Sequence, residues 1–243
     1  MQGQRSKSGI PIRFLGEYLT EEIVIMENPA GLCCPLCGVR TCTFEPNTKK
    51  SPSFCPMKEE SEQLAAIEQT YLEDEDLRKL ACESARTESA GYCRNTRIQE
   101  IMDFAHRIGA TRLGIAHCVG LMEEAKVARE IFLANGFEVE AICCKVGSID
   151  KEKVGLKDEE KVSPGCFEAL CNPVAQATLL ASAGTQLNVV IGLCVGHDSL
   201  FFMHSRAPAT VLVAKDRVLG HNPVAALHTS HSYYRRLKEK QTK

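Results

Sequence analysis

Residues 187–198 read LNVVIGLCVGHD, an apolar run that ends in a glycine-containing turn. The apolar stretch from Leu187 to Gly196 covers about ten residues, whereas a membrane-spanning helix needs about twenty. A continuous apolar run bounded by turn residues is typical of a strand buried on both faces of a parallel sheet. We therefore expect a strand over Leu187–Cys194 and a helix over about residues 198–205.

Strands and helices alternate on both sides of this run. The other expected strands cover residues 113–118, 137–144 and 210–215, and helices are expected over residues 96–108, 122–135 and 172–184. Asn172-Pro173 and Asn222-Pro223 each place an N-cap asparagine before a proline, which predicts the start of a helix. Right-handed crossovers then give an α/β fold, Rossmann-like or flavodoxin-like, with a parallel sheet of about four strands and flanking helices. The G-x-G-x-x-G and P-loop fingerprints of nucleotide sites are missing.

The part of the chain before this pattern divides by composition. Residues 1–31 show no sustained periodicity and are expected to form a loosely ordered extension. Residues 32–58 hold five cysteines among turn-forming residues, have little apolar content and would need a metal or a similar link to hold them together. Residues 59–243 are expected to form a helical lead-in, with a buried apolar stripe on its second helix, followed by the α/β domain.

The composition excludes several classes of protein. The chain has 243 residues, 44% hydrophobic and 25% charged, which is ordinary for a globular protein. Its formal net charge of −2 leaves no excess of positive charge for nucleic acid or a membrane surface, so neither is expected as a partner. The charged stretch over residues 148–162 is expected to be a solvated excursion or a lid.

The thirteen cysteines are the unusual feature. A secreted disulfide scaffold would be short, with an even cysteine count and a signal peptide, and the sequence has none of these. We therefore expect a cytoplasmic protein with reduced thiols. Such thiols serve as metal ligands, as reactive groups or as small buried apolar residues.

The first cysteine group includes a C-x-x-C pair. Its four proposed ligands are Cys34, Cys37, Cys42 and Cys55. Four thiolates complete a tetrahedral metal site, and the C-x-x-C spacing lets a tight turn present two sulfurs to one ion. Zinc and an iron–sulfur cluster both stay open as the cofactor, because Pro56 follows Cys55 as it follows the last ligand of many ferredoxins. The plain alternative is a set of unligated reduced thiols.

The second cysteine group lies where the expected strands end. Its members are Cys118, Cys144, Cys171 and Cys194. Ligands of open parallel sheets bind outside the carboxyl ends of the strands, and helix N-termini there favour thiolates. We expect a metal, iron–sulfur or redox-active thiol site at this edge, with His197 and Asp198 as ligands or proton carriers. The alternatives are that the cysteines only fill space and that Asp198 only caps a helix.

Two further features of this edge concern the orientation of a cysteine and the role of three cations. Strand alternation allows only one of Cys143 and Cys144 to face the crevice, and we assign Cys144 because it lies nearer the strand end. Lys145, Lys215 and Arg217 would give a rim that binds a small anion, or would form ordinary surface ion pairs.

These motifs together resemble a known family. The resemblance rests on the Cys34–Cys55 group, Gly91-Tyr92-Cys93, Cys171-Asn172-Pro173, GLCVGHD at residues 192–198 and KDRVLGHNP at residues 215–223. The chain is similar over about residues 32–240 to the uncharacterised prokaryotic cysteine-rich proteins called domain of unknown function 1847. The resemblance implies metal binding, an intracellular setting and a prokaryotic host, and it supplies no substrate. Cys33, Cys82, Cys143 and Cys166 do not fit the family pattern.

Two functions remain open from the sequence. The first is a metal-binding protein with the N-terminal four-thiolate site and a second cysteine site at the strand edge, with a possible role in redox or sulfur chemistry. The second is a zinc-stapled, non-enzymatic module for a small anionic ligand or a protein partner such as a redox enzyme. Whether the protein is an enzyme is left undecided.

Overall fold

The computed structural model describes residues 32–45 and 49–240, so the expected extension over residues 1–31 lies outside the described residues. Within the described part, the chain forms two compact units, one up to Ala85 and one from Arg86 onwards. Among the residues described, every helix is too short or too polar to span a bilayer.

The first unit contains the N-terminal cysteines and the helical lead-in. Its elements are η2 (Cys34–Leu36), η3 (Thr41–Thr43), α1 (Pro56–Glu59), α2 (Ser61–Glu73) and the greater part of α3 (Glu75–Gly91). The two expected lead-in helices are confirmed, and the second ends at Gly91 as predicted. The expected buried stripe on α3 is wrong at its second half, because Ser84 and Ala85 are exposed.

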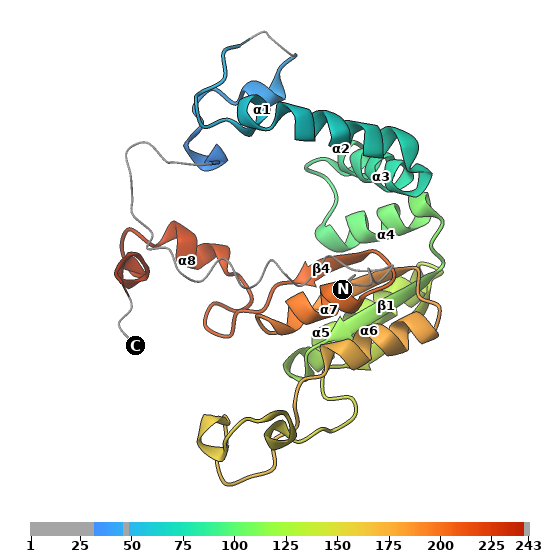
Figure 1. Cartoon of the computed structure of the whole chain (residues 1–243). Helices are drawn as coiled ribbons and strands as arrows, with labels where there is room; N and C mark the ends of the chain where they lie inside the picture. The colour runs from blue at the N-terminus through green and yellow to red at the C-terminus, as the bar shows by residue number, and fades with distance from the viewer. Residues whose placement is uncertain (1–31, 46–48, 241–243) are drawn as a thin grey trace, which may run out of the picture. The chain divides into compact units, whose positions relative to one another are not determined.

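The second unit is built on a four-stranded sheet. The strands are β1 (Arg112–His117), β2 (Glu138–Cys143), β3 (Leu187–Ile191) and β4 (Ala209–Val213). They lie in the order β2-β1-β3-β4 and every pair is parallel, which confirms the expected α/β, Rossmann-like fold (Figure 1). The apolar run that begins at Leu187 supplies β3, in which all five residues are buried.

Helices alternate with these strands. The helices are α4 (Arg97–Ile108), α5 (Met122–Ala134), α6 (Pro173–Ser182), α7 (His197–His204) and α8 (Val224–His228), with 3-10 turns η4 (Val119–Leu121), η5 (Lys151–Val154), η6 (Asp158–Glu160) and η7 (Arg235–Lys238). Right-handed crossovers place α5 on one face of the sheet and α6 and α7, which pack against each other, on the opposite face.

The two Asn-Pro sequences behave differently. Asn172 caps α6 as predicted, because its side-chain oxygen accepts a hydrogen bond from the Ala175 N–H at 3.0 Å. The same expectation is wrong for α8, where Pro223 itself occupies the N-cap position and no side chain caps the helix. The Asn-Pro pair there begins a helix of five residues, Val224–His228.

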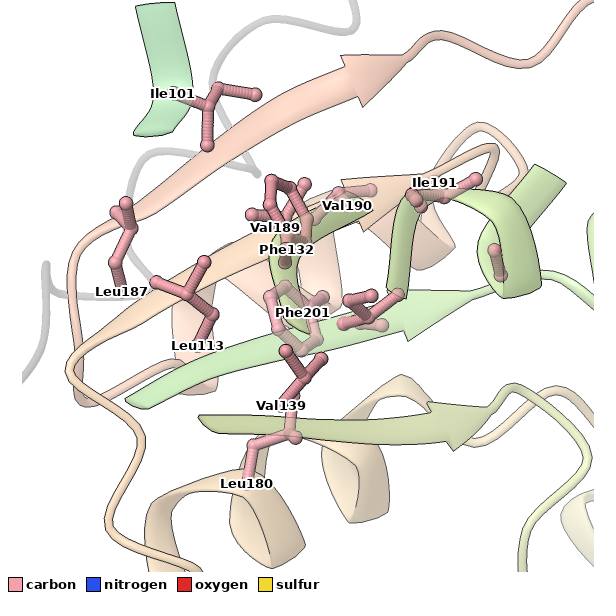
Figure 2. Close-up of a cluster of buried hydrophobic side chains, with 14 of the residues drawn as sticks. Ile101, Leu113, Phe132, Val139, Leu180, Leu187, Val189, Val190, Ile191 and Phe201 are labelled. Atoms are coloured by element: carbon pink, nitrogen blue, oxygen red, sulfur yellow. The ribbon is translucent and has the colours of Figure 1, made fainter. Parts of the chain in front are cut away.

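The core lies on both sides of the sheet. Figure 2 shows its apolar side chains around the strands, including Leu113 from β1, Val189 from β3, Phe132 from α5 and Phe201 from α7. All four are fully buried. Removal of this much apolar surface from water is the main source of stability for the sheet and its helices.

The strand order determines where a ligand site is expected. From β1 the chain crosses to β2 on one side of the sheet, and from β2 it crosses back to β3 on the other side of β1. The order therefore reverses between β1 and β3. The crevice outside the carboxyl ends of these two strands is where ligands bind in open α/β sheets.

Candidate thiolate site

The carboxyl edge of the sheet carries the cysteines that the sequence predicted there. Cys118 directly follows β1, and its N–H donates to the carbonyl of Ile191, the last residue of β3, at 3.1 Å. Cys144 directly follows β2, and its N–H donates to the His117 carbonyl at 2.8 Å. The β1–β2 register pairs His117 with Cys143, so Cys118 and Cys144 come next and side by side.

Cys118 is held as a thiolate by several donors. Lys215, which follows β4, places Nζ 2.8 Å from Cys118 Sγ, and the Gly120 N–H lies 3.5 Å from the same sulfur. The neighbouring Cys144 thiol contributes most to lowering the pKa of Cys118, and Lys215 and Gly120 lower it further, against the effect of burial. The resulting pKa is about 4, so Cys118 carries a negative charge at neutral pH.

Cys144 is the protonated partner of two thiolates. Its Sγ accepts the Val119 N–H at 3.3 Å, so its side chain turns toward the turn after β1. Cys144 belongs to the buried core, and the half-buried Cys143 packs against that core. The pKa of Cys144 is raised, first by the hydrogen bond with Cys118, then by that with Cys171 and by burial. This thiol therefore keeps its proton while its neighbours are charged.

Cys171 completes a group of three sulfurs, which we call the thiol triad (Cys118, Cys144 and Cys171). The Asn172 N–H donates to the Cys144 carbonyl at 2.7 Å and so fixes Cys171 beside β2. The pKa of Cys171 is lowered to about 5, first by the Cys144 thiol and then, against the effect of burial, by the positive charge of Lys145. Cys171 is half-buried, whereas Cys118 and Cys144 are 5% and 2% exposed.

Glycine lets the loop after β3 approach the turn after β1 closely. Gly192 has φ +62°, and a Cβ at this position would lie 2.7 Å from a methyl carbon of Leu121. The turn after β3 therefore packs against the turn after β1 in a way that a larger residue would prevent.

The remaining predicted residues of this edge lie outside the triad. Arg217 Nη2 donates to Cys194 Sγ at 3.0 Å, so this sulfur has a partner of its own. Asp198 accepts hydrogen bonds from the N–H groups of Gly196 and Ser199, which favours its capping role. His197 begins α7, and its Nδ1 is buried without a hydrogen-bond partner.

The cations predicted to form an anion-binding rim contact protein groups instead. Lys215 and Arg217 each donate to a cysteine sulfur, and Lys145 Nζ donates to the Ala169 carbonyl. These contacts indicate that Lys215 and Arg217 hold cysteine sulfurs and that Lys145 holds the loop at Ala169. The three cations are therefore less available to bind an anion from solvent.

One buried polar residue of the site was not identified from the sequence. Gln176 on α6 is fully buried, and its Nε2 donates to the carbonyls of His117 and Ile142 at 3.2 and 2.6 Å. It thereby ties the ends of β1 and β2 together under the triad, while its Oε1 has no partner. The signal available in the sequence was a glutamine in the mostly apolar helix PVAQATLL.

The four N-terminal cysteines that the sequence predicts as metal ligands differ in burial and in their contacts. The Arg40 N–H donates to Cys37 Sγ at 3.2 Å, and this bond is the main cause of the lowered pKa of Cys37. Cys55 is buried, whereas Cys34 and Cys42 are exposed. Across residues 32–45 and 49–240, no group of three or more His, Cys, Asp or Glu side chains is arranged to hold a metal ion. Metal binding by either cysteine group therefore stays a prediction.

Fold and site together define an α/β protein with a Rossmann-like parallel sheet and a group of thiols at its carboxyl edge. The model of the family described as protein of unknown function DUF1847 matches residues 55–212, and the chain belongs to this family, as its motifs predicted. An uncharacterized protein of Methanocaldococcus jannaschii, MJ0455, is 43% identical over 173 residues, which are 71% of this chain and 86% of the relative. No solved structure gives a significant match.

Proposed function

We propose that this protein acts through its thiol triad, in redox or sulfur chemistry on a small molecule with an electrophilic sulfur. The observation that carries the proposal is the placement of Cys118, Cys144 and Cys171 together at the topological switch edge, with Lys215 Nζ 2.8 Å from Cys118 Sγ. The thiolate is the reactive form of cysteine, and low pKa values mark reactive thiols. Thiols of this kind need a reducing compartment, so we place the protein in the cytoplasm.

The cations beside the sulfurs support this function over that of an anion-binding module. A thiolate that receives a hydrogen bond from an ammonium group is charged at neutral pH and remains a nucleophile. A module for an inorganic or organic anion would instead leave its lysines open toward the crevice, whereas here Lys215 contacts Cys118.

Alkylation measured cysteine by cysteine tests the proposal. Reduced protein is treated with iodoacetamide between pH 5 and 9, and peptide mass spectrometry follows Cys171, with the exposed Cys82 on α3 as an internal reference. We expect Cys171 to keep its reactivity down to about pH 5, the value of its pKa. A Cys171 profile that rises only near pH 9, like that of free cysteine, would contradict the proposal.

A second function, metal binding at the N-terminal cysteines, has support of its own. Backbone N–H groups that donate to a cysteine sulfur are a feature of metal–thiolate turns, and Cys37 accepts such a bond from Arg40. Cys34, Cys37, Cys42 and Cys55 would then hold zinc or an iron–sulfur cluster, which would link this segment together. Four cysteine sulfurs are a donor set that suits zinc or an iron–sulfur cluster. In the described residues, however, no three of these sulfurs are arranged around one point.

Elemental analysis of anaerobically purified protein, with an absorbance spectrum, tests this second function. We expect zinc or iron that is lost in Cys37→Ser and kept in the matched control Cys33→Ser. Loss in Cys171→Ser instead would place the metal at the strand edge, among the predicted cofactor ligands Cys118, Cys144, Cys171 and Cys194. Protein free of any metal would rule out both sites.

A further inference from the structure

The three sulfurs of the triad differ in access and in charge. Cys171 is half-buried and ionised, which suits a thiolate that meets a substrate from solvent. Cys144 is 2% exposed, lies between the two thiolates and holds a proton. A shielded, protonated thiol next to an accessible thiolate is the arrangement needed for two successive thiol–disulfide exchanges.

The backbone fixes the spacing of this pair. The Asn172 N–H donates to the Cys144 carbonyl at 2.7 Å, so the segment that carries Cys171 runs beside the end of β2. Cys144 Sγ is in turn anchored by the Val119 N–H at 3.3 Å. Hydrogen-bonded neighbouring segments lie about 5 Å apart, which is within the range of Cα separations that a disulfide spans.

We propose that Cys171 attacks a substrate disulfide and that Cys144 then resolves the mixed disulfide, so that the triad reduces disulfides and closes a Cys144–Cys171 bond. This inference rests on the proposed function and names its substrate class. In the first exchange, the Cys171 thiolate attacks one sulfur of R–S–S–R′, a Cys171–S–R bond forms and R′S⁻ leaves.

In the second exchange, Cys144 gives its proton to its hydrogen-bond partner, the Cys118 thiolate, and attacks Cys171 Sγ. The Cys171–S–R bond breaks and RS⁻ leaves. The substrate disulfide is thereby reduced to two thiolates, and Cys144 and Cys171 are oxidised to one disulfide. A dithiol reductant would return the pair to its reduced form.

The order of the two exchanges follows from the access of the two sulfurs. Cys171 is half-buried and can meet a disulfide from solvent, whereas Cys144 is 2% exposed and can reach only a sulfur that is already joined to Cys171. Lys145 Nζ donates to the carbonyl of Ala169, two residues before Cys171, and its positive charge there favours an anionic disulfide over a cationic one.

Oxidised glutathione, an anionic disulfide, is the probe for the test. The full-length reduced chain is incubated with it anaerobically, quenched with acid and mapped by peptide mass spectrometry. The wild type should pass through a glutathione adduct on Cys171 and accumulate a Cys144–Cys171 disulfide. Cys144→Ser should stop at the Cys171 adduct, with closure lost, and the matched control Cys143→Ser should behave as the wild type. Cystamine, a cationic disulfide, should react more slowly.

The outcomes separate this inference from the proposed function. A glutathione adduct that persists on wild-type Cys171, or a disulfide from Cys144 or Cys171 to Cys118, would contradict the two-step exchange. Neither outcome would contradict the alkylation result. If Cys171 reacts with neither iodoacetamide nor oxidised glutathione, the proposed function is contradicted as well. Mapping of the wild type requires no substitution, so the test holds even if Cys144→Ser does not fold. Faster reaction with cystamine would overturn the preference for an anionic substrate.

Discussion

Lys215 and Cys118 meet at the carboxyl edge of the sheet although 97 positions separate them in the chain, and Lys215 Nζ lies 2.8 Å from Cys118 Sγ. β4 carries Lys215 to this point, because its parallel pairing with β3 brings its carboxyl end to the same edge as that of β1. The contact links the last strand of the sheet to the first. It also gives the thiolate a positive partner that strand propensities do not reveal.

Substitution of this lysine should make Cys118 harder to ionise. In Lys215→Met we expect the pKa of Cys118 to rise by about 1 unit, because an adjacent opposite charge stabilises the thiolate by an amount of that order. The hydrogen bond from Cys144 remains and keeps the pKa below its ordinary value of 9.0. Thiolate absorbance and Cys118 alkylation against pH measure the shift. Arg217→Met, whose partner is Cys194, serves as the control and should leave Cys118 unchanged.

The stability of the protein should depend on pH through the triad. In the folded protein the pKa values of Cys118 and Cys171 are lowered from 9.0 to about 4 and about 5. Between about pH 5 and 9 the unfolded chain binds more protons at these thiols, so the free energy of unfolding rises with pH. Above pH 9 the raised pKa of Cys144 reverses the trend, because the unfolded chain loses that proton first.

Urea unfolding under reducing conditions at pH 5, 7 and 9 measures this dependence. We expect the wild type to gain stability from pH 5 to 9 with a slope below the limit of about 1.4 kcal/mol per pH unit for each proton. The double variant Cys118→Ser/Cys171→Ser should show a flatter curve over the same range. Parallel curves for the two proteins would contradict the lowered pKa values.

The glutamine beneath the triad should be important for stability. Gln176→Leu removes the two hydrogen bonds that join the ends of β1 and β2, and we expect a loss of about 1–3 kcal/mol in the free energy of unfolding. Chemical denaturation measures the loss, and Ser182→Ala, at an exposed position of the same helix, is the control. An equal or greater stability of Gln176→Leu would show that its unpaired Oε1 costs more than its bonds contribute.

The charged excursion before α6 has an anchor that can be tested separately. Lys161 is 7% exposed, and its Nζ contacts Glu152 and Asp158 at 2.7 and 2.6 Å and the Cys166 carbonyl at 2.7 Å. Lys161→Met should loosen residues 150–168 and increase their rate of limited proteolysis severalfold. The control variant Lys157→Met changes a side chain that is 73% exposed, and the protease should cleave this variant at the wild-type rate. Equal protection of both variants would refute the anchoring role.

The sequence was sufficient to predict the sheet and the edge that carries the cysteines. The apolar runs at residues 113–118 and 187–194 end in Cys-Val-Gly, and parallel strands bring such ends to one edge whatever the details of packing. Alternation of side chains allows only one of Cys143 and Cys144 to face the crevice, and nearness to the strand end favours Cys144, whose Sγ accepts the Val119 N–H. Periodicity and topology therefore gave the location of the site.

The contacts inside the site were not predictable in the same way. Cys194 and Cys118 end neighbouring strands in the same motif, yet Cys194 pairs with Arg217 and lies outside the triad. Lys215 and Arg217 were expected either to line an anion site or to form surface ion pairs, but each contacts a cysteine sulfur, which their positions after a strand do not reveal. The buried stripe expected on α3 failed for a related reason, since periodicity identifies a face without showing what covers it.

The triad draws one sulfur from each of three separate stretches of chain, one after β1, one after β2 and one before α6. A newly made chain whose strands have not yet aligned would hold three ordinary thiols, uncharged at neutral pH and slow to exchange. Chemical competence would therefore appear only when the segment before α6 joins the paired ends of β1 and β2, and thiol titration in a refolding experiment would time the completion of this end of the sheet.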